Sequence, residues 1–174
     1  MSIRPAEPRD IENLIAINEA AVPAVNSLEA AELARLIAMS ARTLVSERNE
    51  KPAGFVLCLD ETADYDSRNF LWLKRNFERF FYVDRIAVSP EARGLGLGEK
   101  LYDALVGETS ADGTCAGAPL TCEVNERPPN PGSLRFHKRL GFLEVGRQDL
   151  GDKAVVYLAR ELIPARTATE TENA

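Results

Sequence analysis

Three glycines on alternate positions, Gly94, Gly96 and Gly98, lie between a strand-like segment and a helix-like segment. Residues 82–88 are rich in apolar and β-branched side chains, and residues 96–106 place apolar side chains at helical spacing. Glycine accepts positive φ and lets a ligand approach the main chain, so the first amides of the helix can converge on an anion. The sequence therefore predicts an α/β unit with a seat for a pyrophosphate at mid-chain.

The glycine spacing differs from the two common nucleotide-binding loops. A Walker loop continues with Lys and then Ser or Thr after its last glycine, whereas Glu99 and Lys100 follow Gly98. A Rossmann turn has the spacing Gly-x-Gly-x-x-Gly and follows the first strand of its domain, whereas these glycines are evenly spaced and lie at mid-chain. Neither a P-loop nor a dinucleotide-binding domain is supported.

Apolar periodicity predicts further elements on both sides of this unit. Helices are expected at residues 8–21, from a cap at Asn26 through Ile37, within residues 61–80 and at residues 131–140. Strands are expected at residues 3–6, 43–47, 54–59, 120–125, 143–148 and 154–159, with 43–47 and 54–59 forming a hairpin. The segment at 61–80 mixes aromatic and basic side chains. It is expected either to pack on the domain or to wall an acceptor site.

Length and composition indicate one domain in a soluble setting. The 174 residues and 45% hydrophobic content suit a single core, expected over residues 1–163 and followed by a polar tail at 164–174. A net charge of −6 disfavours nucleic acid and anionic lipid as partners. No apolar run approaches the ~20 residues of a membrane span, and the N-terminus lacks a secretory segment, so a cytoplasmic location without a membrane partner is expected.

Metal-binding residue types are scarce. Cys58, Cys115 and Cys122 are odd in number and lack C-x-x-C spacing, and His137 is the only histidine. A disulfide framework and a zinc site are both disfavoured. Reduced thiols in the core and no metal are expected.

A known family matches the glycine turn. The match consists of Arg93, Gly96 and Gly98 with a lead-in at Ala87, Val88 and Pro90. This stretch resembles the acyl-CoA signature of the GNAT N-acetyltransferase superfamily, Gln/Arg-x-x-Gly-x-Gly/Ala. A second block agrees, with Asn130 opening a helix that carries Ser133 and His137 and ends in Leu140, Gly141 and Phe142. The resemblance covers about residues 3–160. It implies a single α/β (α+β) domain with a mixed, mostly antiparallel sheet flanked by helices.

The same resemblance implies a site for acetyl-CoA as co-substrate. The strand at Ile86, Ala87 and Val88 would pair with the pantetheine arm. The amides of Arg93, Gly94, Leu95, Gly96, Leu97, Gly98 and Glu99 would hold the pyrophosphate, and the Arg93 side chain need not take part. Asn130 would contact the arm of the cofactor, and it also suits an N-cap before Pro131, with Gly141 at the helix end.

Two carboxylates are candidates for the base that deprotonates an amine. Alternation along residues 120–125 puts Glu123 on the polar face of a central strand. In the family branch that acetylates protein N-termini, a Glu at the matching position is implied as the base. Asp84 is the rival, with the same parity as Ile86 and Val88 on the preceding strand. The structural alternatives are a solvated carboxylate for Glu123 and an ion pair with a neighbouring Arg or Lys for Asp84.

His137 stands where most members of the family have the Tyr that protonates the departing thiolate. Imidazole can donate a proton, at a lower pH than phenol. Ser133 lies one turn earlier on the same helical face, where it can bond to His137 or make room for the cofactor. A structural role for His137 is the alternative.

The implied function is transfer of an acetyl group from acetyl-CoA to a primary amine of a small molecule or a peptide N-terminus. The first two helices and residues 61–80 would wall the acceptor site, and the basic groups of that segment suit an acceptor that carries a carboxylate. The alternatives are a non-catalytic acyl-CoA-binding module or sensor, and an interaction domain that binds no CoA. The acyl chain preference and the oligomeric state, including a homodimer, stay open.

Overall fold

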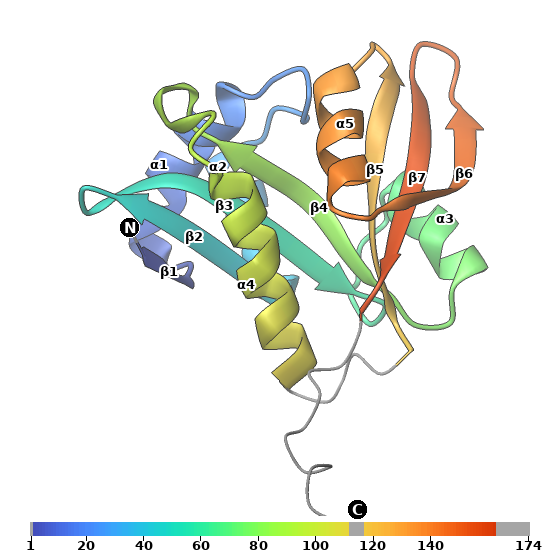
Figure 1. Cartoon of the computed structure of the whole chain (residues 1–174), viewed down its shortest axis with the longest axis horizontal. Helices are drawn as coiled ribbons and strands as arrows, with labels where there is room; N and C mark the ends of the chain where they lie inside the picture. Colours follow the sequence, from blue (N-terminus) through green and yellow to red (C-terminus); the bar gives the residue numbers. More distant parts are fainter. Residues whose placement is uncertain (1, 112–116, 163–174) are drawn as a thin grey trace, which may run out of the picture.

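The computed structural model describes residues 2–111 and 117–162, so Cys115 and the expected tail at 164–174 lie outside the described residues. Figure 1 shows the helices and strands in chain order. The strands are β1 (Ser2–Pro5), β2 (Arg42–Arg48), β3 (Lys51–Asp60), β4 (Phe81–Val88), β5 (Pro119–Arg127), β6 (Leu143–Asp149) and β7 (Ala154–Glu161). The α-helices are α1 (Ile11–Glu19), α2 (Ala30–Met39), α3 (Arg68–Asn76), α4 (Leu97–Ala111) and α5 (Pro131–Arg139), with short 3-10 turns at Pro8–Asp10 and Pro90–Ala92.

The strands form one seven-stranded sheet in the order β1-β2-β3-β4-β5-β7-β6. Every neighbouring pair is antiparallel except β4 and β5, which are parallel. The expected hairpin of β2 and β3 is confirmed. Its turn holds Asn49 and Glu50 at φ of 51° and 61°. The mixed, mostly antiparallel sheet expected from the sequence is therefore confirmed.

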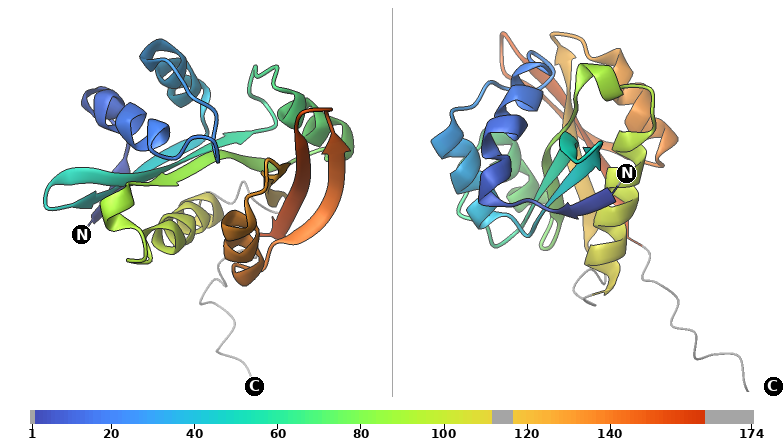
Figure 2. Two further views of the ribbon diagram at one scale, coloured as in Figure 1. Left: turned by 90° about the horizontal axis from the view of Figure 1, so that it is seen from above. Right: turned by 90° about the vertical axis from the view of Figure 1, so that its left-hand side faces the viewer.

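Helices cover both faces of the sheet. Figure 2 shows α1 and α2 on one face and α4 and α5 on the other. One buried cluster joins α1, α2 and α3 to the sheet, and Phe70 and Leu73 of α3 belong to it. A second cluster contains Leu101, Tyr102 and Leu105 of α4 and lies against the opposite face. The aromatic residues of the segment at 61–80 thus include true core residues, as the packing alternative predicted.

The start of the second helix differs from the sequence expectation. Helix α2 begins at Ala30 with Glu29 as its N-cap, and Asn26 does not cap it. The main-chain carbonyl of Asn26 accepts from the Asn18 side chain at 3.0 Å, and its Oδ1 accepts from Lys153 Nζ at 2.9 Å. The polar groups of Asn26 therefore bond to residues elsewhere in the chain. Asn26 lies in a loop, four residues before the helix begins.

The pairing of β4 with β5 is short. Only Phe81 with Leu120 and Tyr82 with Thr121 are in register, and the Thr121 hydroxyl donates to the Phe81 carbonyl at 2.8 Å. Beyond Tyr82 the two strands separate, as Figure 1 shows. The remainder of β4 thus lacks a neighbouring strand on its β5 side, which opens the sheet at its centre.

A β-bulge lies in β4 at the point where the strands separate. Leu57 pairs with Arg85 and Cys58 pairs with Val83, so Asp84 is the extra residue on β4. A bulge places two consecutive residues opposite one residue of the partner strand and breaks the alternation of side chains. The sequence expectation that Asp84 shares a face with Ile86 and Val88 is therefore wrong.

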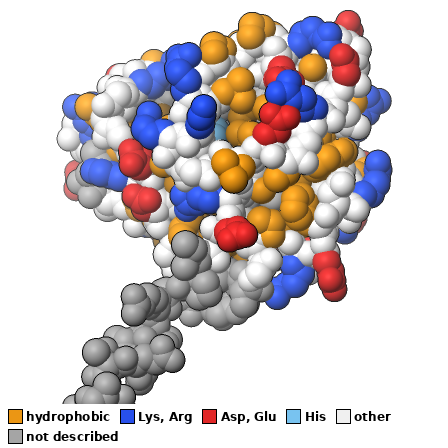
Figure 3. Space-filling view, turned by 45° about the vertical axis from the view of Figure 1, so that its right-hand side comes forward, with side chains coloured by type: hydrophobic (Ala, Val, Ile, Leu, Met, Phe, Trp, Pro, Cys, Tyr) orange, Lys and Arg blue, Asp and Glu red, His pale blue; other side chains and the backbone are white. Residues whose placement is uncertain are grey.

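The surface of the described residues has mixed character. On the face shown in Figure 3, Lys and Arg side chains alternate with Asp and Glu around a group of hydrophobic side chains. The most exposed large apolar residue is Leu143 at the start of β6, with 72% of its surface accessible. Within residues 2–111 and 117–162, none of the helices has the length and apolar character to cross a membrane.

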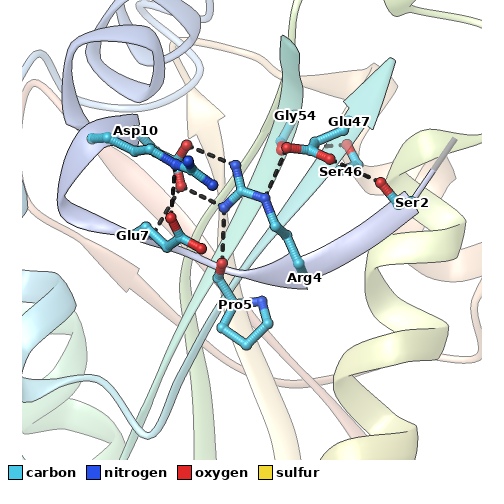
Figure 4. Close-up of polar contacts among 9 residues, drawn as sticks. Ser2, Arg4, Pro5, Glu7, Asp10, Ser46, Glu47 and Gly54 are labelled. Carbon is cyan, nitrogen blue, oxygen red and sulfur yellow. Dashed lines mark hydrogen bonds and ion pairs between the residues drawn. The ribbon is translucent and has the colours of Figure 1, made fainter. Parts of the chain in front are cut away.

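A cluster of charged side chains connects β1 to the rest of the domain (Figure 4). The Arg4 guanidinium donates to both carboxylate oxygens of Asp10, at 2.7 and 2.8 Å, and to Glu47 at 2.8 Å. Asp10 also accepts from the Glu7 amide at 2.8 Å. These bonds from Arg4 hold the pKa of Asp10 below its ordinary value. Arg4 thus joins β1, the turn before α1 and β2.

We expect Arg4→Ala to lower the free energy of unfolding at pH 7 by about 2 kcal/mol, because the Asp10 carboxylate, 4% exposed, loses its cation. The loss should shrink as the pH falls through the depressed pKa of Asp10, where the carboxyl becomes neutral. Urea denaturation at pH 7 and pH 3 measures both. Arg9→Ala is the control, since Arg9 pairs with Glu7 at the surface and should matter by about 0.5 kcal/mol or less. Equal losses for the two variants would contradict this assignment.

Candidate active site

A cavity of about 1130 Å³ occupies the opening between β4 and β5. It continues from the turn before α4 and the N-terminal half of α5 to the loop before α2 and the start of α3. The residues singled out by sequence that line it are Ile86, Ala87, Val88, Arg93, Gly94, Gly96, Leu97, Gly98, Glu99, Glu123, Asn130, Ser133 and His137, together with the rival Asp84. Leu95 does not line it, and 44% of its surface is accessible. The fold thus brings two distant blocks of sequence to one cavity.

Glycine is required at the three positions of the turn for two different structural reasons. Gly94 and Gly96 have φ of 78° and 74°, and a Cβ at either position would meet no other atom within 4 Å. Positive φ therefore requires these two glycines, and the space beside them is open. A Cβ on Gly98 would instead lie 3.0 Å from Cζ of Phe136, so Gly98 allows α4 to approach α5 closely.

Main-chain donors face the cavity at the start of α4. The helix begins at Leu97, and its first intrahelical bond runs from the Lys100 amide to the Gly96 carbonyl at 3.1 Å. The amides just before Lys100 belong to the first helical turn, which has no preceding carbonyls to accept them. Together with the positive end of the helix dipole they suit the pyrophosphate of a coenzyme A thioester.

The Arg93 side chain has partners within the protein. It donates to the Ala20 carbonyl at 3.0 Å and to the Val88 carbonyl at 3.4 Å. It thereby connects the end of β4 to the segment after α1. This geometry agrees with the expectation that the Arg93 side chain need not hold the phosphate.

The second sequence block forms a well-capped helix. Asn130 is the N-cap of α5, its side chain accepts from the Ser133 amide at 3.1 Å, and Pro131 opens the helix. Gly141 follows the helix with φ of 84°. The local interpretation of Asn130 is confirmed, and its place on the cavity wall keeps it available to a ligand.

Glu123 is a carboxyl whose pKa is strongly changed by its surroundings. Burial raises the pKa of its carboxyl to about 7, the nearby Asp84 carboxylate adds to the rise, and hydrogen bonds from Tyr82 and Asn69 oppose it. Its Oε2 is buried and has no hydrogen-bond partner among the described residues. Part of the Glu123 surface still faces the cavity. This carboxyl can therefore exchange a proton near neutral pH, which is what a general base requires.

Asp84 forms the ion pair that its structural alternative predicted. Its Oδ2 lies 2.8 Å from both Nε and Nη2 of Arg85, and both side chains are about 5% exposed. Arg85 also donates to Asn18 at 2.9 Å. The bulge makes this arrangement possible, because it turns two consecutive side chains of β4 toward α1. The Asp84 carboxylate is thus paired with the Arg85 guanidinium inside the protein.

His137 is buried, and both of its ring nitrogens have partners. Nδ1 lies 2.8 Å from the Ser133 carbonyl, and Nε2 lies 2.8 Å from the Tyr102 hydroxyl. Because a carbonyl can only accept, the ring proton is on Nδ1, and Nε2 accepts from Tyr102. Burial lowers the pKa of His137 below its ordinary value, and the bond to Ser133 opposes this. The imidazole is therefore neutral at pH 7.

Sequence reasoning missed several residues of the site. Tyr82 and Asn69 line the cavity and lower the pKa of Glu123, Tyr102 bonds to His137, and Arg85 pairs with Asp84. Sequence reasoning missed Asn69 because it lies on α3, 54 positions before Glu123 in the chain. Asp84 and Arg85 are adjacent, so the sequence could have indicated their ion pair. The direction of the two side chains depends on the bulge in β4.

No group of three or more His, Cys, Asp or Glu side chains suited to a metal occurs within the part of the chain that the structure describes. Cys58 and Cys122 are buried free thiols, and burial raises the pKa of both.

Comparison with known proteins assigns the chain to a family. The sequence profile of the acetyltransferase (GNAT) family matches residues 12–142, most of the chain. The protein belongs to this family, as its glycine turn predicted. Among characterised relatives, peptidyl-lysine N-acetyltransferase YjaB of Salmonella typhimurium is 32% identical over 82 residues, which are 47% of this chain and 50% of that protein. The chain thus matches about half the length of this relative.

Solved structures share the fold. The ribosomal-protein-S18-alanine N-acetyltransferase of Escherichia coli superposes with a TM-score of 0.69 at 18% identity, covering 99% of both chains. Ard1 of Thermoplasma volcanium gives 0.71 at 18% identity and covers 93% of this chain and 97% of its own. Arabidopsis thaliana NAA60, in complex with a bisubstrate analogue, gives 0.70 at 17% identity and covers 94% and 99%. At these identities the likeness establishes the fold alone.

We expect Gly96→Ala to weaken acetyl-CoA binding at least tenfold, because alanine at φ of 74° costs about 1–2 kcal/mol and turns the adjoining amides away from the ligand. Gly107→Ala is the matched control. Gly107 lies within α4, has no atom within 4 Å of an added Cβ, and should leave affinity unchanged. Isothermal titration calorimetry measures both. Equal affinity of the Gly96→Ala variant and the parent protein would remove the glycine turn from the cofactor site.

The raised pKa of Glu123 predicts a cost in stability. Between the ordinary value of 4.5 and about 7 the unfolded chain loses this proton while the folded protein keeps it, so stability falls as the pH rises. Glu123→Gln should stabilise the fold at pH 8 by about 3 kcal/mol at most and leave it unchanged at pH 4. Thermal unfolding across this range measures the difference. A stability difference that does not vary with pH would contradict the assigned pKa.

Proposed function

We propose that this protein is an N-acetyltransferase that moves the acetyl group of acetyl-CoA directly to a primary amine. The observation that carries the proposal is that Glu123, a carboxyl with a pKa raised to about 7, lines the cavity that also contains the glycine turn. Membership of the GNAT family supports an acetyl-CoA-dependent reaction. The base and the cofactor seat thus lie in one cavity.

Glu123 takes a proton from the acceptor. Amines are mostly protonated at neutral pH, with a pKa of ~10.4 for a lysine side chain and ~7.7–8.0 for an α-amine, and only the free lone pair attacks. With a pKa of about 7, Glu123 is half ionised at neutral pH. We propose that its carboxylate accepts this proton, directly or through a water. Asp84 is not the base, since Arg85 holds it in an ion pair.

In the transfer step one bond forms and one bond breaks. The amine nitrogen forms a bond to the thioester carbon, the carbonyl oxygen becomes an oxyanion, and collapse of this intermediate breaks the carbon–sulfur bond. Main-chain N–H groups of β4 near Ile86 and Val88 stabilise the oxyanion, because the separation from β5 leaves this side of the strand without a neighbouring strand. The nitrogen gives up one proton as it becomes an amide, and the coenzyme A thiolate takes up one proton.

His137 assists the return of that proton together with Tyr102. The neutral ring keeps its one proton on Nδ1 against the Ser133 carbonyl, so it can protonate sulfur only after Nε2 has taken a proton from Tyr102 or solvent. A thiol with a pKa near the ~8.5 of cysteine is also a tolerable leaving group without an acid. We therefore propose an assisting, nonessential role for His137.

The proposed acceptor is a primary amine of a peptide or of a small molecule. The named activities of YjaB and of the Escherichia coli S18-alanine enzyme concern a peptide lysine and a protein alanine, which support a peptide amine. The carboxylate expected from the basic side chains of residues 61–80 has less support, since Tyr65, Ser67 and Asn69 are the residues of this segment that line the cavity.

We expect Glu123→Gln to lower kcat by about 10²–10⁴-fold while the Kd for acetyl-CoA stays within twofold, because a glutamine fills the same space without accepting a proton. In the parent protein kcat/KM should rise with pH through about 7, as Glu123 ionises. A coupled thiol-release assay against peptides with free N-termini, lysine peptides, polyamines and amino acids measures both. Unchanged turnover in the variant would remove Glu123 from the mechanism.

The same assay separates the enzyme from the alternative of an acyl-CoA-binding module or sensor. A sensor would bind acetyl-CoA and yet release no thiol with any amine of the panel. Glu123 lines the cavity with a pKa near 7, which favours the enzyme. Burial of a carboxyl costs free energy and does not strengthen the binding of acetyl-CoA in a module that only binds.

A further inference from the structure

One side-chain hydrogen bond crosses the mouth of the cavity. Lys153 lies in the turn between β6 and β7, and its Nζ donates at 2.9 Å to Oδ1 of Asn26, in the loop between α1 and α2. Both side chains are exposed and line the cavity, and the reaction described above uses neither of them. Lys153 and Asn26 thus face each other across the opening, at the end of the cavity away from the glycine turn.

The ammonium group of Lys153 has a neutral partner and no anionic one. Among residues 2–111 and 117–162, no carboxylate forms an ion pair with it, and Asn26 Oδ1 is its hydrogen-bond acceptor. A carboxylate accepts a stronger hydrogen bond from an ammonium group than a neutral amide does. A carboxylate on a ligand in the cavity can therefore replace Asn26 at Nζ.

The other cations on the cavity wall are arginines that already have partners or lie near the cofactor seat. Arg85 is paired with Asp84 inside the protein, and Arg93 donates to main-chain carbonyls. Arg139 lies over the Phe136 ring, which contacts the glycine turn. Lys153 is thus the cation that a ligand can pair with at the end away from the turn.

The register of β5 and β7 gives the distance between Glu123 and Lys153. Glu123 is opposite Tyr157, and Lys153 lies four residues before Tyr157, just ahead of β7. Four residues of extended chain span about 13 Å. Since an extended peptide advances about 3.3–3.6 Å per residue, a peptide with its amine at Glu123 brings its third or fourth residue to Lys153. The carboxylate of a free amino acid is too close to its own amine to reach both groups.

Asn125 lies between these two residues on the cavity wall. It is two positions after Glu123 on β5, so both side chains point to the same face of the sheet. Its side-chain amide lines the cavity and has no hydrogen-bond partner among the described residues. An amide both donates and accepts, as the main chain of a peptide does. Asn125 therefore suits an extended peptide better than the apolar stem of a lysine side chain.

We propose that Lys153 determines acceptor specificity: its ammonium group leaves Asn26 and binds a carboxylate on the third or fourth residue of a peptide whose free N-terminus is the acceptor. This inference rests on the proposed function and names the class of acceptor. A carboxylate on the acceptor then pairs with the turn between β6 and β7, and not with the basic side chains of residues 61–80.

Peptide binding to the protein loaded with coenzyme A tests the proposal without turnover. The probes are amidated hexapeptides with an N-terminal alanine and one glutamate at the third or fourth position, each with a glutamine counterpart. In the parent protein glutamate should strengthen binding about fivefold, as an exposed ion pair does. Lys153→Met should remove this preference, and Lys153→Glu should reverse it. Isothermal titration calorimetry measures each affinity.

Lys51→Met is the matched control. Lys51 is an exposed lysine at the start of β3 that does not line the cavity, so its loss removes the same charge and should keep the preference for glutamate. Should Lys153→Met fail to fold, Lys153→Gln gives the same comparison. Equal affinities of glutamate and glutamine peptides for the parent, or a preference that persists without Lys153, overturns the proposal. Failure of the proposed function looks different: the preference in binding then remains, while none of the peptides releases thiol from acetyl-CoA.

Discussion

The separation of β4 from β5 after two residue pairs is the constraint on which the site depends. A sheet that stayed paired along its length would place β5 against the main chain of Ile86 to Val88, and the cavity could not form. The bond from Thr121 to the Phe81 carbonyl and the two residue pairs hold the strands together at one end. At the other end, the turn before α4 and the N-terminus of α5 occupy the two sides of the opening. Cofactor seat and base are neighbours because the sheet is open there.

A buried carboxyl in such an opening acts as a base only if its surroundings keep its pKa near neutral pH. Desolvation alone would keep Glu123 protonated, and full pairing with a cation would make it too weak a base. The bulge in β4 leaves Asp84 and Arg85 in a buried ion pair near Glu123, and the Asp84 carboxylate adds to the rise in the pKa of Glu123. Hydrogen bonds from Tyr82 and Asn69 oppose the effects of burial and Asp84, and the pKa of Glu123 lies near 7.

Local sequence signals predicted the parts that depend on neighbours in the chain. The even glycine spacing predicted the turn, because positive φ at Gly94 and Gly96 is a property of each residue by itself. Asn130, Pro131 and Gly141 likewise marked the ends of α5. The same kind of reasoning failed at Asn26, whose groups bind Asn18 and Lys153, and at Asp84, where the bulge reversed its face.

The sequence by itself determined the family, the order of most helices and strands, and the polar position of Glu123 on β5, since these follow from residue type, periodicity and a local motif. Only the tertiary structure decided that the Asp84–Arg85 ion pair is buried and that the pKa of Glu123 is raised, because burial depends on packing. It also decided that α3 supplies Asn69 to the site and that the ring nitrogens of His137 are occupied by Tyr102 and Ser133. Apart from the bond between His137 and Ser133, which are one helical turn apart, these contacts join residues far apart in the chain, and no spacing within the sequence encodes them.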